Sequence, residues 1–343
     1  MKKLFYAAVM LLVCSVLSAR EAELFRLEAE VRVDYMQEYL ENDKVDDVSG
    51  FKGKYLNFRI DGKIAEGLTY SWRQRLNNVK TNSSFFDDTD WATVNYNIGR
   101  WNFNAGRQVV GIGGYEYDMA PIDCYFNSEY WNNIACYQFG VSASYAVGNK
   151  GDNLLFQFCE SPFRWNAINV NNGEMFAYNL MWFGNHGCFS SIYSLNMIEW
   201  LPGRFINYIT LGNRFVFGDF DLELDYMNRT VSFNRFIGGD MSVMADFAWN
   251  VSDRVTLFAK LTYDVNNTDE IGDLCVTPGT DILRVGGGIE YYPLKSTKNL
   301  RLHLNCCYAD GKSPASAIIR PKQTIVDAGV TWRMKLLDLK RKN

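Results

Sequence analysis

The stretch "LFRLEAEVRVDY", residues 24–35, decides the fold class because apolar and polar residues alternate through it from Phe25 onward. A repeat of two residues over this length predicts a β-strand, since a helix would repeat near every 3.6 residues. One face of the strand would be apolar and the other charged. The apolar face holds Phe25, Leu27, Ala29, Val31, Val33 and Tyr35, and the charged face holds Arg26, Glu28, Glu30, Arg32 and Asp34.

The same alternation runs along the rest of the 343-residue chain and predicts sixteen strands. All seven prolines lie in the connections between the segments, as expected, because proline cannot donate a hydrogen bond to a sheet. The predicted strands are 24–40, 51–61, 67–77, 91–99, 101–110, 136–147, 153–161, 174–184, 188–199, 204–216, 218–230, 240–250, 254–265, 280–292, 299–309 and 324–337. Met244 and Phe258 are apolar residues on otherwise polar faces.

The connections alternate in length, which favours a transmembrane β-barrel over a soluble sheet. Short turns such as "GR" and "NVSD" follow the even-numbered segments, and mostly long, polar connections follow the odd-numbered ones. We therefore predict an all-β antiparallel barrel with short periplasmic turns and longer extracellular loops. In lipid, only a closed barrel pairs the backbone groups of every strand. The alternative is a pair of β-sandwiches, whose strands are usually shorter than these.

The N-terminus, "MKKLFYAAVMLLVCSVLSA", has the basic, apolar and small-residue regions of a secretory signal peptide. We predict that residues 1–19 are removed, that 20–337 form one barrel, and that 338–343 form a basic periplasmic tail. The protein is then expected in the outer membrane of a bacterium with two membranes. Its expected surroundings are outer-membrane lipids and lipopolysaccharide.

Cysteine and histidine usage predicts no metal site and no cofactor. Seven cysteines remain after residue 19, without a CxxC pair or metal-ligand spacing, and the chain has two histidines. One bridge between Cys124 and Cys136 stays open as an alternative to apolar packing of these side chains.

The glycine-rich stretch "VVGIGGYEYD", residues 109–118, raises the question of phosphate binding. A nucleotide site needs a helix after the glycines, and here no GK[ST] follows and no Lys or Arg occurs between Gln108 and Asn149. We expect neither a nucleotide nor a nucleic acid as a partner. Instead, the stretch opens the longest connection, 111–135, which we predict folds inward and narrows the barrel. Its predicted constriction residues are Gly113, Gly114, Glu116, Asp118, Asp123 and Glu129.

The segments "GRQVVGIGGYEYDMAPID", "CYQFGVSASYAV" and "VDAGVTWRMKLL" resemble the phosphate-selective porin O/P family in its Bacteroidetes form. The resemblance implies a passive, trimeric outer-membrane channel for small hydrophilic solutes, with anionic or phosphate-like solutes as one alternative. The acids of 111–135 stand where selective members carry lysines, so anion preference stays open. The residues that carry the family pattern are Gly106, Arg107, Gln108, Gly113, Gly114, Glu116, Asp118, Pro121 and Ile122.

Inward-facing charges are the first candidates for solute contact in such a channel. Basic residues concentrate in the first three strands and the last, which become neighbours when the barrel closes, and acids of 218–230 lie far round the wall. This arrangement predicts a field across the pore. Aromatic residues near strand ends, Trp91 among them, are expected to anchor the barrel in the membrane interface. The basic candidates are Arg26, Arg32, Arg59, Arg73, Arg75, Arg107, Lys260, Arg301, Arg333 and Lys335.

Two other functions remain as alternatives. One is a structural or adhesive barrel that presents its loops, and the other is a membrane-barrel lipid hydrolase. A hydrolase needs a Ser/His pair near the outer lipid face, whereas His186 falls in a periplasmic turn and His303 faces the lumen. We therefore predict that the protein is not an enzyme.

Overall fold

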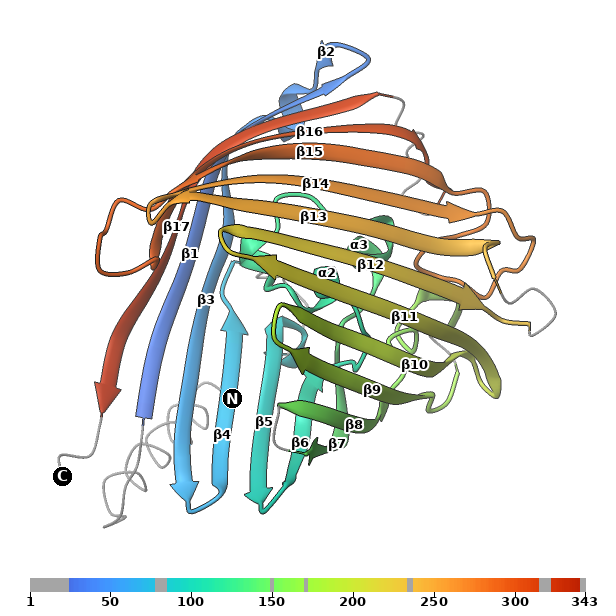
Figure 1. Ribbon diagram of the computed structural model, residues 1–343. Coiled ribbons are helices and arrows are strands. Elements are labelled where there is room, and N and C mark those ends of the chain that lie inside the picture. Colours follow the sequence, from blue (N-terminus) through green and yellow to red (C-terminus); the bar gives the residue numbers. More distant parts are fainter. Residues whose placement is uncertain are drawn as a thin grey trace.

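The computed structural model describes residues 25–77, 85–148, 151–169, 172–232, 237–314 and 322–339. Within them the chain forms a closed antiparallel β-barrel of sixteen long strands and one two-residue strand, β2, which prolongs a hairpin (Figure 1). The predicted signal peptide and residues 340–343 of the predicted tail lie outside the described residues.

The sixteen-strand prediction is confirmed, and every predicted boundary lies within four residues of the observed one. The strands are β1 (Phe25–Leu40), β2 (Asp43–Lys44), β3 (Gly50–Ala65), β4 (Leu68–Arg75), β5 (Thr89–Ile98), β6 (Trp101–Val109), β7 (Tyr137–Val147), β8 (Asp152–Glu160), β9 (Phe176–His186), β10 (Phe189–Leu201), β11 (Arg204–Phe217), β12 (Phe220–Thr230), β13 (Asp240–Ser252), β14 (Val255–Asn266), β15 (Asp281–Tyr291), β16 (Leu300–Lys312) and β17 (Gln323–Leu339).

The barrel closes between its first and last strands. Along the chain, each long strand pairs antiparallel with the next, and β1 pairs with both β3 and β17. In the closing ladder, Arg32 lies opposite Thr331 and Asp34 lies opposite Gly329. Among the strands that the structure describes, closure leaves no long strand with a free edge, which is the condition for a sheet to cross lipid.

The helices are short and belong to the connections. They are η1 (Asp46–Val48), η2 (Phe85–Asp88), α2 (Tyr115–Asp118), η3 (Pro121–Asp123), α3 (Glu129–Asn133) and η4 (Ala167–Asn169). Among the described residues, no helix has the length and apolar character needed to cross a membrane.

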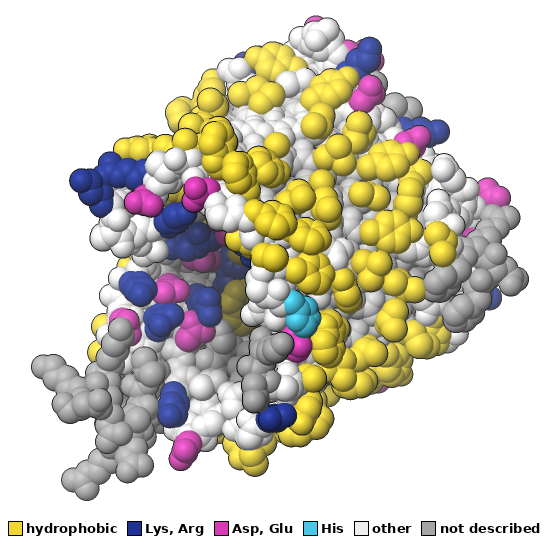
Figure 2. Space-filling model, in the orientation of Figure 1, with side chains coloured by type: hydrophobic (Ala, Val, Ile, Leu, Met, Phe, Trp, Pro, Cys, Tyr) yellow, Lys and Arg dark blue, Asp and Glu magenta, His cyan; other side chains and the backbone are white. Residues whose placement is uncertain are grey.

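The outer face of the barrel is apolar and the inner face is polar. On β8, for example, Phe156 and Phe158 are exposed on the outside, whereas Gln157 between them is buried inside. Figure 2 shows hydrophobic side chains covering most of the visible wall. This is the reverse of a soluble protein and matches a lipid-facing surface.

A hydrophobic core lies inside the barrel, around the connection between β6 and β7. We call this connection, residues 110–136, the inner loop. Figure 1 shows its helices α2 and α3 within the ring of strands. Its Ile112 and Tyr130 are buried with wall residues such as Tyr208. The two off-pattern residues of the sequence face the inner loop: Met244 is buried and lines a small cavity with Met119, and the ring of Phe258 stacks on Tyr125 with 4.8 Å between centroids.

Gly106, a residue of the family pattern, is required by the backbone of β6. Its φ is +125°, and a Cβ there would overlap the carbonyl oxygen of Ala92 on β5. We predict that Gly106→Ala lowers the free energy of unfolding by about 1–3 kcal/mol. Gly53→Ala is the control, because a Cβ at Gly53 meets no atom within 4 Å. Urea unfolding in detergent micelles measures both, and equal midpoints would contradict the prediction.

Candidate functional site

Glycines at the start of the inner loop let its backbone lie directly on the wall. The amide N–H of Gly111 donates to Gln157 Oε1 (2.6 Å), and that of Gly113 donates to Ser194 Oγ (2.9 Å). A Cβ on Gly113 would stand 2.8 Å from the carbonyl oxygen of Ile192, and Gly114 has φ +101°. Side chains at these positions would push the loop off β10.

Carboxylates of the wall bind the N-terminal N–H groups of the two loop helices. Asp225 accepts from the N–H of Tyr115 (3.0 Å) and of Glu116 (2.8 Å), where α2 begins. Asp264 accepts from the N–H of Glu129 (2.8 Å), where α3 begins. These N–H groups have no partner within a helix, and negative charge near them is stabilising.

Three of the four loop acids form ion pairs with basic residues on four consecutive strands, β14 to β17. Glu116 and Glu129 are buried in these pairs, and Asp123 is partly exposed. Because buried charges need partners, these pairs fix the loop to this side of the barrel. The pairs are Glu116 with Lys260 (2.8 Å), Glu129 with Arg284, and Asp123 with Arg301 (3.0 Å) and Arg333 (2.6 Å).

Arg32 on β1 holds the loop in a different way, through its backbone. This buried guanidinium donates from Nη1 to the carbonyl oxygens of Ile122 (3.2 Å) and Cys124 (2.6 Å). It also pairs with Asp34 (Nη2–Oδ2, 2.8 Å). The arginine therefore satisfies loop carbonyls that have no helical partner.

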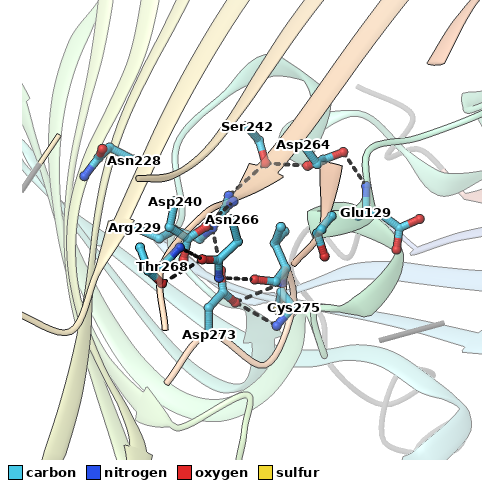
Figure 3. A network of polar contacts seen from close by, with 12 residues as sticks. Glu129, Asn228, Arg229, Asp240, Ser242, Asp264, Asn266, Thr268, Asp273 and Cys275 are labelled. Carbon is cyan, nitrogen blue, oxygen red and sulfur yellow. Dashed lines mark hydrogen bonds and ion pairs between the residues drawn. The ribbon is translucent and has the colours of Figure 1, made fainter. Parts of the chain in front are cut away.

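A polar network extends this anchoring to the connection between β14 and β15 (Figure 3). Arg229 pairs with Asp240 (2.8 Å) and with Asp273 (2.6 Å), and it donates to Ser242 (2.8 Å). Ser242 bonds in turn to Asp264, the residue that receives the N–H of α3. The network thus joins the wall, the inner loop and a second connection.

On the opposite side, the inner loop leaves an open cavity of about 720 Å³ against the wall formed by β3 to β9. Arg59, Arg73 and Arg75 line it from the wall, and Asp118 lines it from the loop. Figure 2 shows a hollow with both basic and acidic side chains around it.

The arginines of this cavity are held by acids and by Trp91. Arg59 pairs with Asp61 (2.8 Å), and Arg75 pairs with Asp90 (2.6 Å). The guanidinium carbons of Arg59 and Arg73 lie 5.6 and 5.1 Å from the Trp91 ring centroid. The prediction that Trp91 anchors the membrane interface is wrong. The ladder between β4 and β5 has a bulge at this position. The indole faces the cavity and donates a hydrogen bond to Ser71 (2.7 Å).

The ten basic candidates therefore divide into groups. Arg32, Lys260, Arg301 and Arg333 anchor the inner loop, while Arg59, Arg73 and Arg75 line the cavity. Arg26 pairs loosely with Glu28 (3.9 Å), and Lys335 is exposed near the end of β17.

Arg107 differs from the pore-lining prediction. Its guanidinium lies 5.7 Å from the ring of Phe139, an exposed residue of the outer face, and it donates to the carbonyl oxygen of Thr89 (2.7 Å). Its neighbour Gln108 points inward instead and accepts from Ser142 (2.9 Å). Successive residues of a strand face opposite sides, so the family pattern places only one of the two in the lumen.

Two basic residues of the site, Arg284 and Arg229, are not among the sequence candidates. Arg229 follows Asp221, Glu223 and Asp225 at every second position, so its inward direction was readable from the alternation. Arg284 lies in the less regular segment 280–292, where alternation gives a weaker signal. The acids of β12 do not form a free charged wall, because Asp221 pairs with Arg214 and Asp225 binds the loop.

All seven cysteines in the described residues are free, so Cys124 and Cys136 form no bridge. Burial raises the pKa of the Cys124 thiol to about 12 and that of Cys136 to about 11. Both thiols therefore stay protonated at neutral pH and act as small packing groups.

The loop anchors can be tested with Lys260→Met, which leaves Glu116 buried without its cation. We expect the free energy of unfolding to fall by roughly 3–5 kcal/mol. The control is Lys335→Met, because Lys335 is exposed. Urea titration in micelles measures both variants, and equal midpoints would show that the pair does not hold the loop.

Residues 25–179 match the family described as phosphate-selective porin O and P. In fold, the chain is similar to an anion-selective porin from Comamonas acidovorans, with a TM-score of 0.61 and 15% identity over 91% of this chain and 100% of that one. It is also similar to OmpT, an outer membrane protein of Vibrio cholerae in trimer form, with a TM-score of 0.60 and 13% identity over 92% of this chain and 100% of that one. A mutant Rh. blastica porin is similar with a TM-score of 0.57 and 14% identity over 90% of this chain and 100% of that one.

Identities this low establish a shared fold alone. No curated protein matches the chain in sequence. The family match and the fold agree with each other and with the resemblance seen in the sequence. Residues 25–179 are therefore similar to the phosphate-selective porin O and P family, and the sixteen-strand barrel has the fold of porins.

Proposed function

We propose that the protein is a passive outer-membrane channel for small hydrophilic solutes, with a preference for anions. The observation that carries the preference is the separation of charges by the inner loop. Three of its acids pair with cations on β14 to β17, whereas the open cavity on the other side is lined by Arg59, Arg73 and Arg75.

The exposed parts of this arginine cluster lie where a solute passes. The side chains of Arg59 and Arg75 are 40% and 29% exposed, whereas Arg73 is buried between Glu30 and Asp90. Salt screens exposed charges beyond roughly 8–10 Å, so only charges beside the path affect an ion. The cluster lies beside the path of the solute, while the charges that anchor the loop lie between the loop and β14 to β17.

Neutral groups of the cavity suit hydrated solutes. Asn95, Asn104 and Gln108 present amides to the cavity from β5 and β6. Amides can both donate and accept hydrogen bonds, so they replace part of a solute's water without a charge preference. We infer that the amides set permeability to hydrophilic molecules and that the arginines set the bias toward anions.

We further propose that the protein is not an enzyme. A barrel hydrolase needs an activated nucleophile near the outer lipid face. His186 lies at the short turn between β9 and β10, and His303 is enclosed by Asp34 and Asp327. A lipase assay on the purified barrel tests this, and turnover abolished by His186→Gln would overturn it.

We also propose export by the signal peptide, contact of the apolar belt with lipids and lipopolysaccharide, and assembly as a homotrimer. The exposed apolar side chains of the outer wall support the membrane contact, and the trimer form of OmpT supports the oligomer. Light scattering of detergent-purified protein measures the oligomeric state, and a monomer would refute the trimer.

The arginine cluster can be tested by planar-bilayer recording of Arg59→Gln/Arg75→Gln. In a KCl gradient, we expect the zero-current potential to move toward cation preference relative to wild type. Arg107→Gln is the control, because it removes one guanidinium charge from the outer face. An unchanged potential in the double variant would remove the cluster as a selectivity element, and absence of conductance in wild type would refute the channel itself.

Asp118 gives a test of opposite sign. It is the loop acid that lines the cavity. Asp118→Asn removes a negative charge beside the path, so we expect a shift toward anion preference. Raising the salt concentration should shrink this shift because exposed charges are screened. A shift toward cations would contradict the placement of Asp118.

A further inference from the structure

Three polar side chains meet at the seam where the barrel closes. Asp34 on β1, His303 on β16 and Asp327 on β17 all face inward and are 0%, 5% and 3% exposed. The ring of Tyr125, from the inner loop, lies 4.7 Å from the imidazole of His303. The cluster is therefore enclosed between the wall and the loop.

The spacing of the three ligand atoms fits one small cation. His303 Nε2 lies 3.3 Å from Asp34 Oδ1 and 3.2 Å from Asp327 Oδ1, and all three atoms lie within 4.8 Å of one another. A tetrahedral zinc ion with bonds of about 2.0–2.1 Å holds neighbouring ligand atoms about 3.3–3.4 Å apart. The two contacts of the imidazole match this spacing.

The oxygens that would not bind the cation are held by other donors. Asp34 Oδ2 receives Arg32 Nε (2.9 Å) and Nη2 (2.8 Å), and Asp327 Oδ2 receives Asn305 Nδ2 (3.1 Å). Arg32 Nε also lies 3.1 Å from Asp34 Oδ1, which keeps a second lone pair. Hydrogen bonds of this kind orient carboxylates in metal sites.

The imidazole itself is left without ordinary hydrogen bonds. Within the described residues, neither ring nitrogen of His303 makes a hydrogen bond of normal geometry, nor does Asp327 Oδ1. A buried polar group without a partner costs free energy. A ligand between the imidazole and the carboxylates would remove this cost.

Gly329 provides the space between the ligands. In the ladders it lies opposite both Asp34 and His303. A Cβ at this position would overlap Asp34 Oδ1 and stand 2.7 Å from His303 Cε1. The absence of a side chain therefore keeps the ligand atoms of three strands close together.

We propose that Asp34, His303 and Asp327 form a site for a divalent transition-metal ion, with Zn²⁺ as the expected occupant. One imidazole and two carboxylates are ligands that zinc accepts, and a water molecule would complete the tetrahedron. The ion would join β1, β16 and β17 beneath the inner loop, so its role is structural.

The test uses the full-length barrel, purified in detergent and treated with a chelator before Zn²⁺ is added. We expect one zinc per chain by elemental analysis after gel filtration, and at least tenfold weaker binding in calorimetry for His303→Gln. His186→Gln is the matched control, since it removes the other histidine of the chain and should leave the affinity unchanged. Asp327→Asn is a second variant, and gel mobility checks that each variant is folded.

Co²⁺ serves as the spectroscopic probe, because the chain also has free thiols. Tetrahedral d–d bands without a thiolate charge-transfer band would support the His/Asp site. A thiolate band, failure to retain zinc, or equal retention by folded His303→Gln and wild type would overturn it. The competing arrangement is a protonated His303 imidazolium paired with both carboxylates, and failure to retain zinc would indicate it.

Discussion

Charges enclosed within the barrel must be paired, and this requirement organises the lumen. The inner loop brings acids into a space whose wall already carries acids and bases. Its Glu116 and Glu129 are stable there because Lys260 and Arg284 face them, and Asp225 and Asp264 take up the N–H groups of its helices. The loop therefore lies against one side of the barrel, and the open path lies against the other.

The sequence predicted the barrel well because alternation is a local property that lipid and lumen impose on every strand. Met244 and Phe258 broke the pattern where the inner loop packs, so these exceptions also carried information. Trp91 was misplaced beside a bulge, since one additional residue moves a side chain to the other face. Arg107 was misplaced because the family pattern does not distinguish the two faces of β6.

The roles of the charges could not be predicted in the same way. An acidic loop suggests a cation-preferring constriction when it is read alone, but partners such as Lys260 lie on strands far away in sequence. His303 presents a similar case, because its neighbours Asp34 and Asp327 lie on two other strands and meet it only after closure. Spacing rules for metal ligands detect ligands that are close in sequence, whereas closure of the barrel brings together residues from the first strand and the last two strands of the chain.

The position of the seam also has a consequence for biogenesis. Asp123, near the middle of the inner loop, pairs with Arg301 on β16 and Arg333 on β17, and the backbone around it is held by Arg32 on β1. The loop is made early, but its partners on β16 and β17 are the last strands of the chain to be made. Docking of the loop therefore depends on contacts of long sequence separation, which form slowly. Until β16 and β17 have been synthesised, the inner loop cannot form its ion pairs with them.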